Sequence, residues 1–259
     1  MNERVALITG GAKGIGRGIA LDLASRHWKI AICYRTSEAD AQKTALAITE
    51  RGGQALAVRC DVSDPVAAKH LATQVEQTWG RIDVLINGAG PYHRVNLFDE
   101  TVEGWNDMFD GNLHPIFYLA KAVAPGMKAR KSGHIINFSM ANADQMISQP
   151  DVTGHYIAKA GVLILTRTLA KLLAPHGITV NAFCPGNVDS PMWGVIDRDR
   201  GALLGKAPGE LFKEVAGRSP LGRTQVPTDI PPLVSFLVSD GSGAITGQAI
   251  NVDNGVVMY

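Results

Sequence analysis

The chain has 259 residues, and its 25 lysines and arginines nearly balance its 24 aspartates and glutamates, for a formal charge of +1. This balance excludes the strongly basic surface with which proteins bind nucleic acid or anionic membranes, so we expect small molecules and other protein chains as partners. A chain of this length can bury a large core, and α/β proteins of this size commonly fold as one domain.

No stretch approaches the ~20 consecutive apolar residues that a transmembrane helix needs. The segment Met1 to Arg4 leads into the first strand without the arrangement of a signal peptide. The three cysteines, Cys33, Cys60 and Cys184, are odd in number and have no metal-ligand spacing. We expect them to be reduced core residues of a cytoplasmic protein that binds neither a metal nor a membrane.

Apolar runs typical of buried strands alternate with helical patterns along the chain. The predicted strands are 5–8, 29–34, 55–59, 82–86, 134–139, 178–183 and 249–252. The predicted helices are 14–26, 37–51, 64–79, 102–130, 153–175 and 226–238, with Ser37 and Asp64 as N-caps. This alternation predicts an α/β fold: a Rossmann-like, doubly wound parallel sheet of about seven strands with helices on both faces.

Residues 187–222 mix proline, glycine and charged residues without a clear period. A long irregular segment inside a compact domain is usually a lid or a binding loop. We therefore predict a single domain over residues 1–259, in which 187–222 forms a substrate-binding loop or lid. Pro91-Tyr92-His93 and the stretch from Trp193 to Arg218 would form walls of the substrate site, which favours a partly apolar substrate.

The first strand runs directly into a glycine-rich turn, Thr9-Gly10-Gly11-Ala12-Lys13-Gly14-Ile15-Gly16, which opens the first helix. A strand that turns tightly into a helix points free backbone N–H groups and the positive end of the helix dipole at one place, which suits an anionic diphosphate. Glycine is needed where the chain takes a positive φ or where a side chain would hold the phosphate away. By itself the turn is a weak signal, because turns without a ligand use the same residues.

A second motif, Asn87-Gly88-Ala89-Gly90, follows another predicted strand. Together the two motifs resemble the short-chain dehydrogenase/reductase family, which carries Thr-Gly-x-x-x-Gly-x-Gly at the first turn and Asn-x-Ala-Gly after the fourth strand. The match extends through Asn112, Lys159 and Pro185-Gly186 to the stretch Ile245 to Gln248. The resemblance implies hydride transfer between a nicotinamide and a carbonyl or alcohol substrate. It also implies dimers or tetramers, and the apolar ending Val256 to Tyr259 is compatible with burial against a neighbouring chain.

The end of the second strand favours NADP(H) over NAD(H). NAD-specific folds of this kind place an acidic residue there, which binds the ribose hydroxyls. Here the strand ends in Tyr34-Arg35-Thr36-Ser37, so Arg35 can bind a 2′-phosphate, with Thr36 and Ser37 as further donors. Lys13 would approach from the opposite side. The alternative is that Arg35 and Lys13 are solvated surface charges.

The resemblance implies cofactor contacts after five of the predicted strands and at Lys159. The expected cofactor-binding residues are Gly10, Lys13, Gly14, Ile15, Gly16, Tyr34, Arg35, Thr36, Ser37, Asp61, Val62, Asn87, Gly88, Ala89, Lys159, Pro185, Gly186, Val188 and Ser190. Asp61 and Val62 would lie near the adenine, and Ser190 stands where the family has a threonine that binds the carboxamide. An equally simple role for Asn87 is to tie neighbouring strands together through its amide.

The family's catalytic tyrosine precedes a lysine by four residues, and counting back from Lys159 gives His155, whereas Tyr156 is only three residues away. At ~100° of rotation per residue, the two side chains point to different faces of the helix. Either the usual acid is a histidine here or the helix begins in an altered register. The helical pattern after Lys159 favours His155, which leaves Tyr156 as a packing or subunit-contact residue.

The family's catalytic serine also has no clear counterpart, because the fifth strand ends in Asn137-Phe138-Ser139-Met140 and places Met140 in the serine position. Asn142, Asp144 and Ser148 follow in a loop and could supply a polar group, although a surface loop is the favoured interpretation. Asn112 matches the family residue that kinks its helix and holds a water. The expected catalytic group is Asn112, Ser139, His155, Tyr156 and Lys159.

The favoured hypothesis is an NADP(H)-dependent reductase or dehydrogenase with a modified catalytic group. The positive charge of Lys159 would favour a neutral imidazole at His155, which can still donate a hydrogen bond or accept a proton. The first alternative is a dinucleotide-binding protein without redox turnover, which serves as a sensor or partner subunit. A second alternative is non-redox chemistry in the same cleft with His155 as general base.

Overall fold

The computed structural model describes residues 3–258, so Met1 and Asn2 of the N-terminal segment and Tyr259 of the apolar ending lie outside the described residues. Seven parallel strands form one sheet in the order β3-β2-β1-β4-β5-β6-β7. The strands are β1 (Val5–Thr9), β2 (Lys29–Tyr34), β3 (Gln54–Arg59), β4 (Val84–Asn87), β5 (Gly133–Phe138), β6 (Ile178–Pro185) and β7 (Ala249–Val252). The predicted parallel sheet is confirmed.

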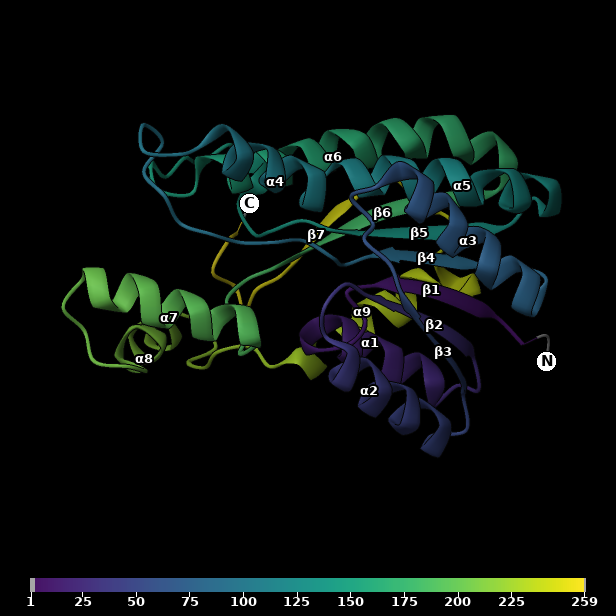
Figure 1. Cartoon of the computed structure of the whole chain (residues 1–259), viewed down its shortest axis with the longest axis horizontal. Helices are drawn as coiled ribbons and strands as arrows, with labels where there is room; N and C mark the ends of the chain where they lie inside the picture. The colour runs from purple at the N-terminus through teal and green to yellow at the C-terminus, as the bar shows by residue number, and fades with distance from the viewer. Residues whose placement is uncertain (1–2, 259) are drawn as a thin grey trace.

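Helices cover both faces of this sheet, as Figure 1 shows. The helices are α1 (Gly14–Ala24), α2 (Glu38–Glu50), α3 (Pro65–Trp79), α4 (Val102–Asn112), α5 (His114–Arg130), α6 (Thr153–Leu173), α7 (Pro191–Leu203), α8 (Glu210–Gly217) and α9 (Pro231–Leu237). Helices α1, α2 and α9 pack on one face, and α3, α5 and α6 pack on the other.

The alternation of side chains along β1 explains the two layers. Ala6 and Ile8 belong to the cluster under α1, α2 and α9, whereas Val5 and Leu7 belong to the cluster under α3, α5 and α6. All four side chains are almost fully buried. A strand that is apolar at every position must be covered on both sides, so its sequence alone requires a doubly wound sheet.

The prediction of one helix over residues 102–130 is wrong, because the helix is interrupted. Helix α4 ends at Asn112 and α5 begins at His114, with Pro115 in its first turn. Proline has no N–H and favours the first turn of a new helix over the interior of an old one. The predicted helix over 226–238 is interrupted for the same reason: a 3₁₀ turn at Pro227–Asp229 precedes α9, which begins at Pro231.

The expectation that residues 187–222 are irregular is also wrong, because this segment contains α7 and α8. Ser190 caps α7 by accepting a hydrogen bond from the backbone N–H of Trp193 at 3.4 Å, and Pro191 occupies the first helical position. The rings of Trp193 and Phe212 lie 5.6 Å apart, so the two helices pack on each other. In Figure 1 the pair extends beyond the sheet at the end where the arrow of β4 points.

Both predicted N-cap residues lie at the N-cap position of their helices, but only Asp64 makes a capping hydrogen bond. The Asp64 carboxylate accepts a hydrogen bond from the N–H of Val66 at 2.8 Å. Ser37 precedes α2, but its side chain makes no capping hydrogen bond. All three cysteines carry free thiols; Cys33 and Cys184 are buried, and Cys60 is half-buried.

Candidate active site

The glycine-rich turn folds so tightly that Gly10 and Gly16 have no room for a side chain, and two of its glycines take a backbone conformation that other residues rarely adopt. Gly10 and Gly14 have positive φ, at +68° and +57°. A Cβ atom on Gly16 would lie 2.3 Å from the carbonyl oxygen of Gly10, and one on Gly10 would lie 2.7 Å from that of Gly88. The turn therefore brings the ends of β1 and β4 against each other at the carboxyl edge of the sheet.

The N-terminus of α1 is open to a ligand. Among the described residues, no side chain caps it, and no acidic residue lies in its first turn. Its first backbone N–H groups and the positive end of the helix dipole are thus available for an anion. Ser190 and Pro191, at the start of α7, are the nearest groups to the position of a Cβ on Gly14, at 3.9 and 3.8 Å. This donor set fits the diphosphate of a dinucleotide, with the 187–222 segment beside it.

The residues expected near the adenosine gather at the ends of β2 and β3. Arg35 and Thr36 are exposed, whereas Tyr34 and Val62 are buried. The guanidinium of Arg35 lies 3.6 Å from the Asp61 carboxylate. Asp61 also accepts hydrogen bonds from the backbone and the hydroxyl of Ser63. No acidic side chain belongs to the end of β2 itself, so Arg35 is the charged group there.

Asn87 ties strands together, which is one of the two roles that the sequence left open. Its Nδ2 donates to Oδ1 of Asn137 at 2.8 Å, and Nδ2 of Asn137 donates to the hydroxyl of Thr166 at 2.9 Å. The chain of bonds thus joins β4, β5 and α6. The backbone N–H groups of Gly88 and Ala89 donate to the Thr9 hydroxyl at 3.0 and 3.2 Å, which joins β4 to β1.

Lys159 is buried at the centre of the site. Its Nζ donates to the carbonyl oxygen of Phe138 at 3.1 Å, and burial lowers the pKa of Lys159 to about 8. The buried hydroxyl of Ser139 donates to the carbonyl oxygen of Lys159 at 2.9 Å, so it joins the end of β5 to α6. Met140 packs against the buried cluster of Ala143, Leu163, Ala182 and Cys184. Asn142, Asp144 and Ser148 lie in the loop that follows.

His155 and Tyr156 occupy different environments. His155 is buried. Burial, together with the charges of Lys159 and His93, lowers its pKa to about 3, although a hydrogen bond to the Pro91 backbone acts in the opposite direction. Its ring lies edge-on against Tyr92, with centroids 5.1 Å apart. Tyr156 is half-buried, which raises its pKa. Tyr92 and Asp151 also raise the pKa of Tyr156, and the charges of Arg94 and Arg200 oppose this shift.

Asn112 holds the loop that follows β4. Its Nδ2 donates to the carbonyl oxygens of Pro91 and Met108, both at 3.0 Å. A Cβ on Gly90 would lie 2.2 Å from Oδ1 of Asn112, so only glycine fits there. Asn112 therefore sets the path of the chain that brings Tyr92 and His93 to His155.

On the expected nicotinamide side, Gly186 and Val188 are fixed by residues that the sequence did not single out. The N–H of Gly186 donates to Oε1 of Gln225 at 2.9 Å, and Val188 pairs with Gln225 in a parallel bridge. Gln225 is buried. Pro185 is the last residue of β6, and Ser190 caps α7 as described.

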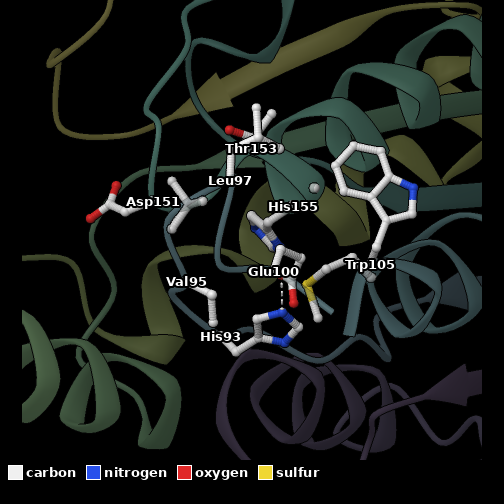
Figure 2. A pocket seen from close by; sticks show the side chains of 11 residues that line it. His93, Val95, Leu97, Glu100, Trp105, Asp151, Thr153 and His155 are labelled. Carbon is white, nitrogen blue, oxygen red and sulfur yellow. Dashed lines mark hydrogen bonds and ion pairs between the residues drawn. The ribbon is translucent and has the colours of Figure 1, made fainter. Parts of the chain in front are cut away.

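A small cavity adjoins the buried face of α6 and is seen in Figure 2. It is lined by residues of the loop after β4, of α4 and of the start of α6: His93, Val95, Leu97, Glu100, Trp105, Met108, Asp151, Val152, Thr153, Gly154 and His155. Nε2 of His93 lies 2.7 Å from the Glu100 carboxylate. Arg94 donates from Nε to Asp151 at 3.0 Å and from Nη1 to the Tyr92 hydroxyl at 2.8 Å.

The sequence had indicated Tyr92 and His93 as walls but not the partners that hold them. No spacing rule relates Glu100 or Asp151 to His93 and Arg94, so no signal in the sequence could have paired them. Within residues 3–258, no helix combines the length and the apolar character of a membrane span. The same residues contain no group of three or more histidines, cysteines and acidic side chains that could hold a metal ion.

The chain is similar to one known family and to several known proteins along nearly its whole length. The family model described as Enoyl-(Acyl carrier protein) reductase matches residues 10–257. The chain is 34% identical over 253 residues to a 3-oxoacyl-[acyl-carrier-protein] reductase of Staphylococcus aureus, which covers 98% of both chains. It is 36% identical over 256 residues to a galactitol 2-dehydrogenase of Agrobacterium fabrum, again covering 98% of both.

Solved structures agree with the sequence comparisons. A single-substitution variant of actinorhodin polyketide ketoreductase with NADPH superposes with a TM-score of 0.94 at 31% identity, covering 100% of this chain and 98% of the other. A short-chain dehydrogenase/reductase variant of Serratia marcescens matches with a TM-score of 0.86 at 27% identity, covering 98% of this chain and 97% of the other. These similarities span the whole chain rather than the glycine-rich turn alone.

Proposed function

Because this chain belongs to the short-chain dehydrogenase/reductase family, we propose that it is an NADP(H)-dependent oxidoreductase that interconverts a carbonyl compound and an alcohol. The observation that carries the proposal is the placement of His155 and Lys159 on one buried face of α6, beside the edge where the open end of α1 can take a diphosphate. Arg35 at the end of β2 supports NADP(H), as does the NADPH of the structural relative.

When bound, NADPH supplies the hydride that the carbonyl carbon accepts. The chain's own residues must orient the cofactor and manage the proton. Lys159 would hold the nicotinamide ribose, and Ser190 and the backbone near Gly186 would hold the carboxamide. His155 would donate a hydrogen bond from its ring N–H to the substrate oxygen, and the proton that the oxygen requires as it becomes a hydroxyl would come from water in the site. Tyr92 and the segment 187–222 would exclude bulk water from the reacting groups.

The alternative is a dinucleotide-binding protein that does not turn over. The low pKa of His155 favours it, because a neutral imidazole is a weak acid. Ser139 lies next to the position of the family's catalytic serine. It is not a free proton donor either, because its hydroxyl donates to the carbonyl oxygen of Lys159. In this case the altered side chains would leave cofactor binding intact. The reaction rate would fall by the ~10²- to 10⁴-fold acceleration that a positioned acid supplies.

One experiment separates the two. NADPH is titrated into the purified chain by fluorescence, and a panel of carbonyl compounds, including 3-oxoacyl thioesters and keto sugars, is tested with native protein and with His155→Gln, Tyr156→Phe and His155→Tyr. Turnover by the native chain that His155→Gln abolishes supports the proposal. Turnover lost only in Tyr156→Phe transfers the role to Tyr156. Binding with turnover only in His155→Tyr establishes the alternative.

Self-association is part of the proposal. Four large apolar side chains are at least 46% exposed on α5 and α6: Phe117, Ile157, Ile164 and Leu172. Exposed apolar groups on neighbouring helices are typical of surfaces that bind another chain. A dimer or tetramer is expected on a sizing column at micromolar concentration, and a monomer there would contradict this part of the proposal.

A further inference from the structure

Two of the three cysteines lie together at the edge of the sheet where the adenosine is expected. Cys33 belongs to β2, and Cys60 directly follows β3, which is the last strand of the sheet on this side. Cys33 is paired in register with Val58 of β3. Because side chains alternate along a strand, Val58 and Cys60 share a face with Cys33. Both cysteines accordingly pack in the layer under α3, α5 and α6.

The two thiols are in contact. The Cys33 thiol donates to the carbonyl oxygen of Cys60 at 3.5 Å and also lies within hydrogen-bonding reach of the Cys60 sulfur. The contact with Cys33 lowers the pKa of Cys60, although burial and the charges of Asp61 and Asp64 oppose this shift. Cys60 is half-buried, whereas Cys33 is only 2% exposed. An oxidant from solvent therefore meets Cys60 first, and the thiolate is the form that it attacks.

A disulfide between these residues requires the chain after β3 to move. Residues two steps out of register on neighbouring parallel strands lie roughly 8 Å apart between Cα atoms, whereas a disulfide holds them at ~4.4–6.8 Å. Cys60 is the residue that can shift, because it lies beyond the end of β3, and no described strand pairs with the outer edge of β3. Its backbone N–H donates to the carbonyl oxygen of Tyr34 at 2.8 Å, and the shift would strain this bond.

The residues that follow Cys60 are those expected near the adenine. The Asp61 carboxylate accepts hydrogen bonds from the backbone and the hydroxyl of Ser63, and it lies 3.6 Å from the Arg35 guanidinium. Val62 is buried. A shift of Cys60 displaces Asp61 and Val62, since they are its next neighbours in the chain. Its effect falls on the adenosine half of the dinucleotide, which NADPH and NADH share.

We propose that Cys33 and Cys60 form a redox-modification site, at which hydrogen peroxide joins them in a disulfide that weakens dinucleotide binding. The inference rests on the proposed function. The Cys60 thiolate attacks one peroxide oxygen: an S–O bond forms, the O–O bond breaks, and the hydroxide that leaves takes up the proton that Cys60 had released. The Cys33 sulfur then attacks the Cys60 sulfur: the S–S bond forms, the S–O bond breaks, and the hydroxide leaves as water with the Cys33 proton. The two thiols together lose two electrons, and the peroxide is reduced to two water molecules.

The test treats the reduced, purified full chain with hydrogen peroxide and then removes the peroxide. Peptide mapping by mass spectrometry should find Cys33 joined to Cys60, and the buried Cys184 of β6 should remain a thiol. Fluorescence titration should show that the dissociation constants for NADPH and for NADH both rise about 10-fold, which is the value of one lost hydrogen bond. Dithiothreitol should restore both constants.

Variants of each cysteine provide the controls. Cys60→Ser and Cys33→Ala each remove one partner of the disulfide, so both should bind NADPH like the reduced native chain and should keep that affinity after peroxide. Cys60→Ser changes a half-buried position and so perturbs the core less than Cys33→Ala does. Cys184→Ala keeps the pair, and its ratio of oxidised to reduced dissociation constants should equal that of the native chain.

The outcomes are distinct. Absence of a link between Cys33 and Cys60 after peroxide overturns the proposal. A link that leaves both dissociation constants unchanged also overturns it, as does a loss of affinity that persists in Cys60→Ser, because another oxidation is then responsible. If the reduced native chain binds neither dinucleotide, the proposed function fails and the regulation fails with it. Binding by the reduced chain that peroxide does not alter removes only the regulation.

Discussion

The ammonium group of Lys159 lies 3.1 Å from the carbonyl oxygen of Phe138 and is buried between α6 and the end of β5. This hydrogen bond does not replace the water that the ammonium group loses, so burial lowers the pKa of Lys159 to about 8. The charged lysine therefore costs the fold free energy. A side chain kept in such a place is better explained by a role in the site than by stability.

Replacing Lys159 by methionine should stabilise the protein at pH 7 while it abolishes turnover. The folded-state pKa is below the unfolded value of 10.5, so the native state is penalised at every pH below about 8, and stability rises between about 8 and 10.5. The shift corresponds to about 3 kcal/mol, of which the lost hydrogen bond to Phe138 offsets about 1 kcal/mol. Urea unfolding at pH 7 measures the gain.

The control is Lys171→Met, an exposed position on the same helix, where stability should change by less than about 0.5 kcal/mol. The gain from Lys159→Met should shrink as the pH is raised from 8 to 10.5. Equal or lower stability of Lys159→Met at pH 7 would show that the buried ammonium group is not a cost.

The buried His155 should make the protein sensitive to acid. Its folded-state pKa of about 3 is below the ordinary value of 6.5, so the unfolded chain binds more protons between these values, and stability falls as the pH drops from 6.5 towards 3. The native chain should lose roughly 4 kcal/mol more over this window than His155→Gln does. Urea unfolding of both proteins at pH 7, 5.5 and 4.5 follows the first part of this loss, which should reach about 2–3 kcal/mol at pH 4.5. His134, whose pKa is also lowered by burial, is common to both. Parallel pH profiles would contradict the assignment.

Arg35 should decide the preference between the two dinucleotides. Its guanidinium is exposed, and its ion pair with Asp61 at 3.6 Å is a surface contact of little energetic weight. Arg35→Ala should therefore leave stability unchanged but weaken NADPH binding ~10- to 100-fold, the value of one or two charge-assisted hydrogen bonds. NADH binding should not change. Fluorescence titration with both cofactors measures this, with the exposed Arg51→Ala as control. An equal loss of NADH affinity would show that Arg35 does not bind the 2′-phosphate.

Gly16 should tolerate no side chain. A Cβ there would lie 2.3 Å from the carbonyl oxygen of Gly10, a backbone atom that cannot move without opening the turn. Gly16→Ala should destabilise the fold by about 1–3 kcal/mol and weaken NADPH binding. In Gly217→Ala, the added Cβ meets no described atom within 4 Å, and this control in α8 should be neutral or more stable by about 0.5–1 kcal/mol. Thermal unfolding and NADPH titration of both variants test the pair.

The register of α6 could be predicted from the sequence because a helix repeats every ~3.6 residues whatever its surroundings. Four residues of separation put His155 and Lys159 on one face, and both are buried. The break between α4 and α5 could also have been predicted from the sequence, because Pro115 is incompatible with a continuous helix there. The helices within residues 187–222 were missed because their stability comes from contacts such as that between Trp193 and Phe212.

The sequence by itself determined the parallel sheet, the glycine-rich turn and the candidate pair on α6, because each is encoded by a short-range pattern: uninterrupted apolar strands, glycine spacing and helical periodicity. Only the tertiary structure decided that His93 and Glu100 share a cavity with His155, that Asn87 bonds to Asn137, and that burial lowers the pKa of Lys159. These properties depend on residues far apart in the chain and on the exclusion of water, which local patterns do not carry.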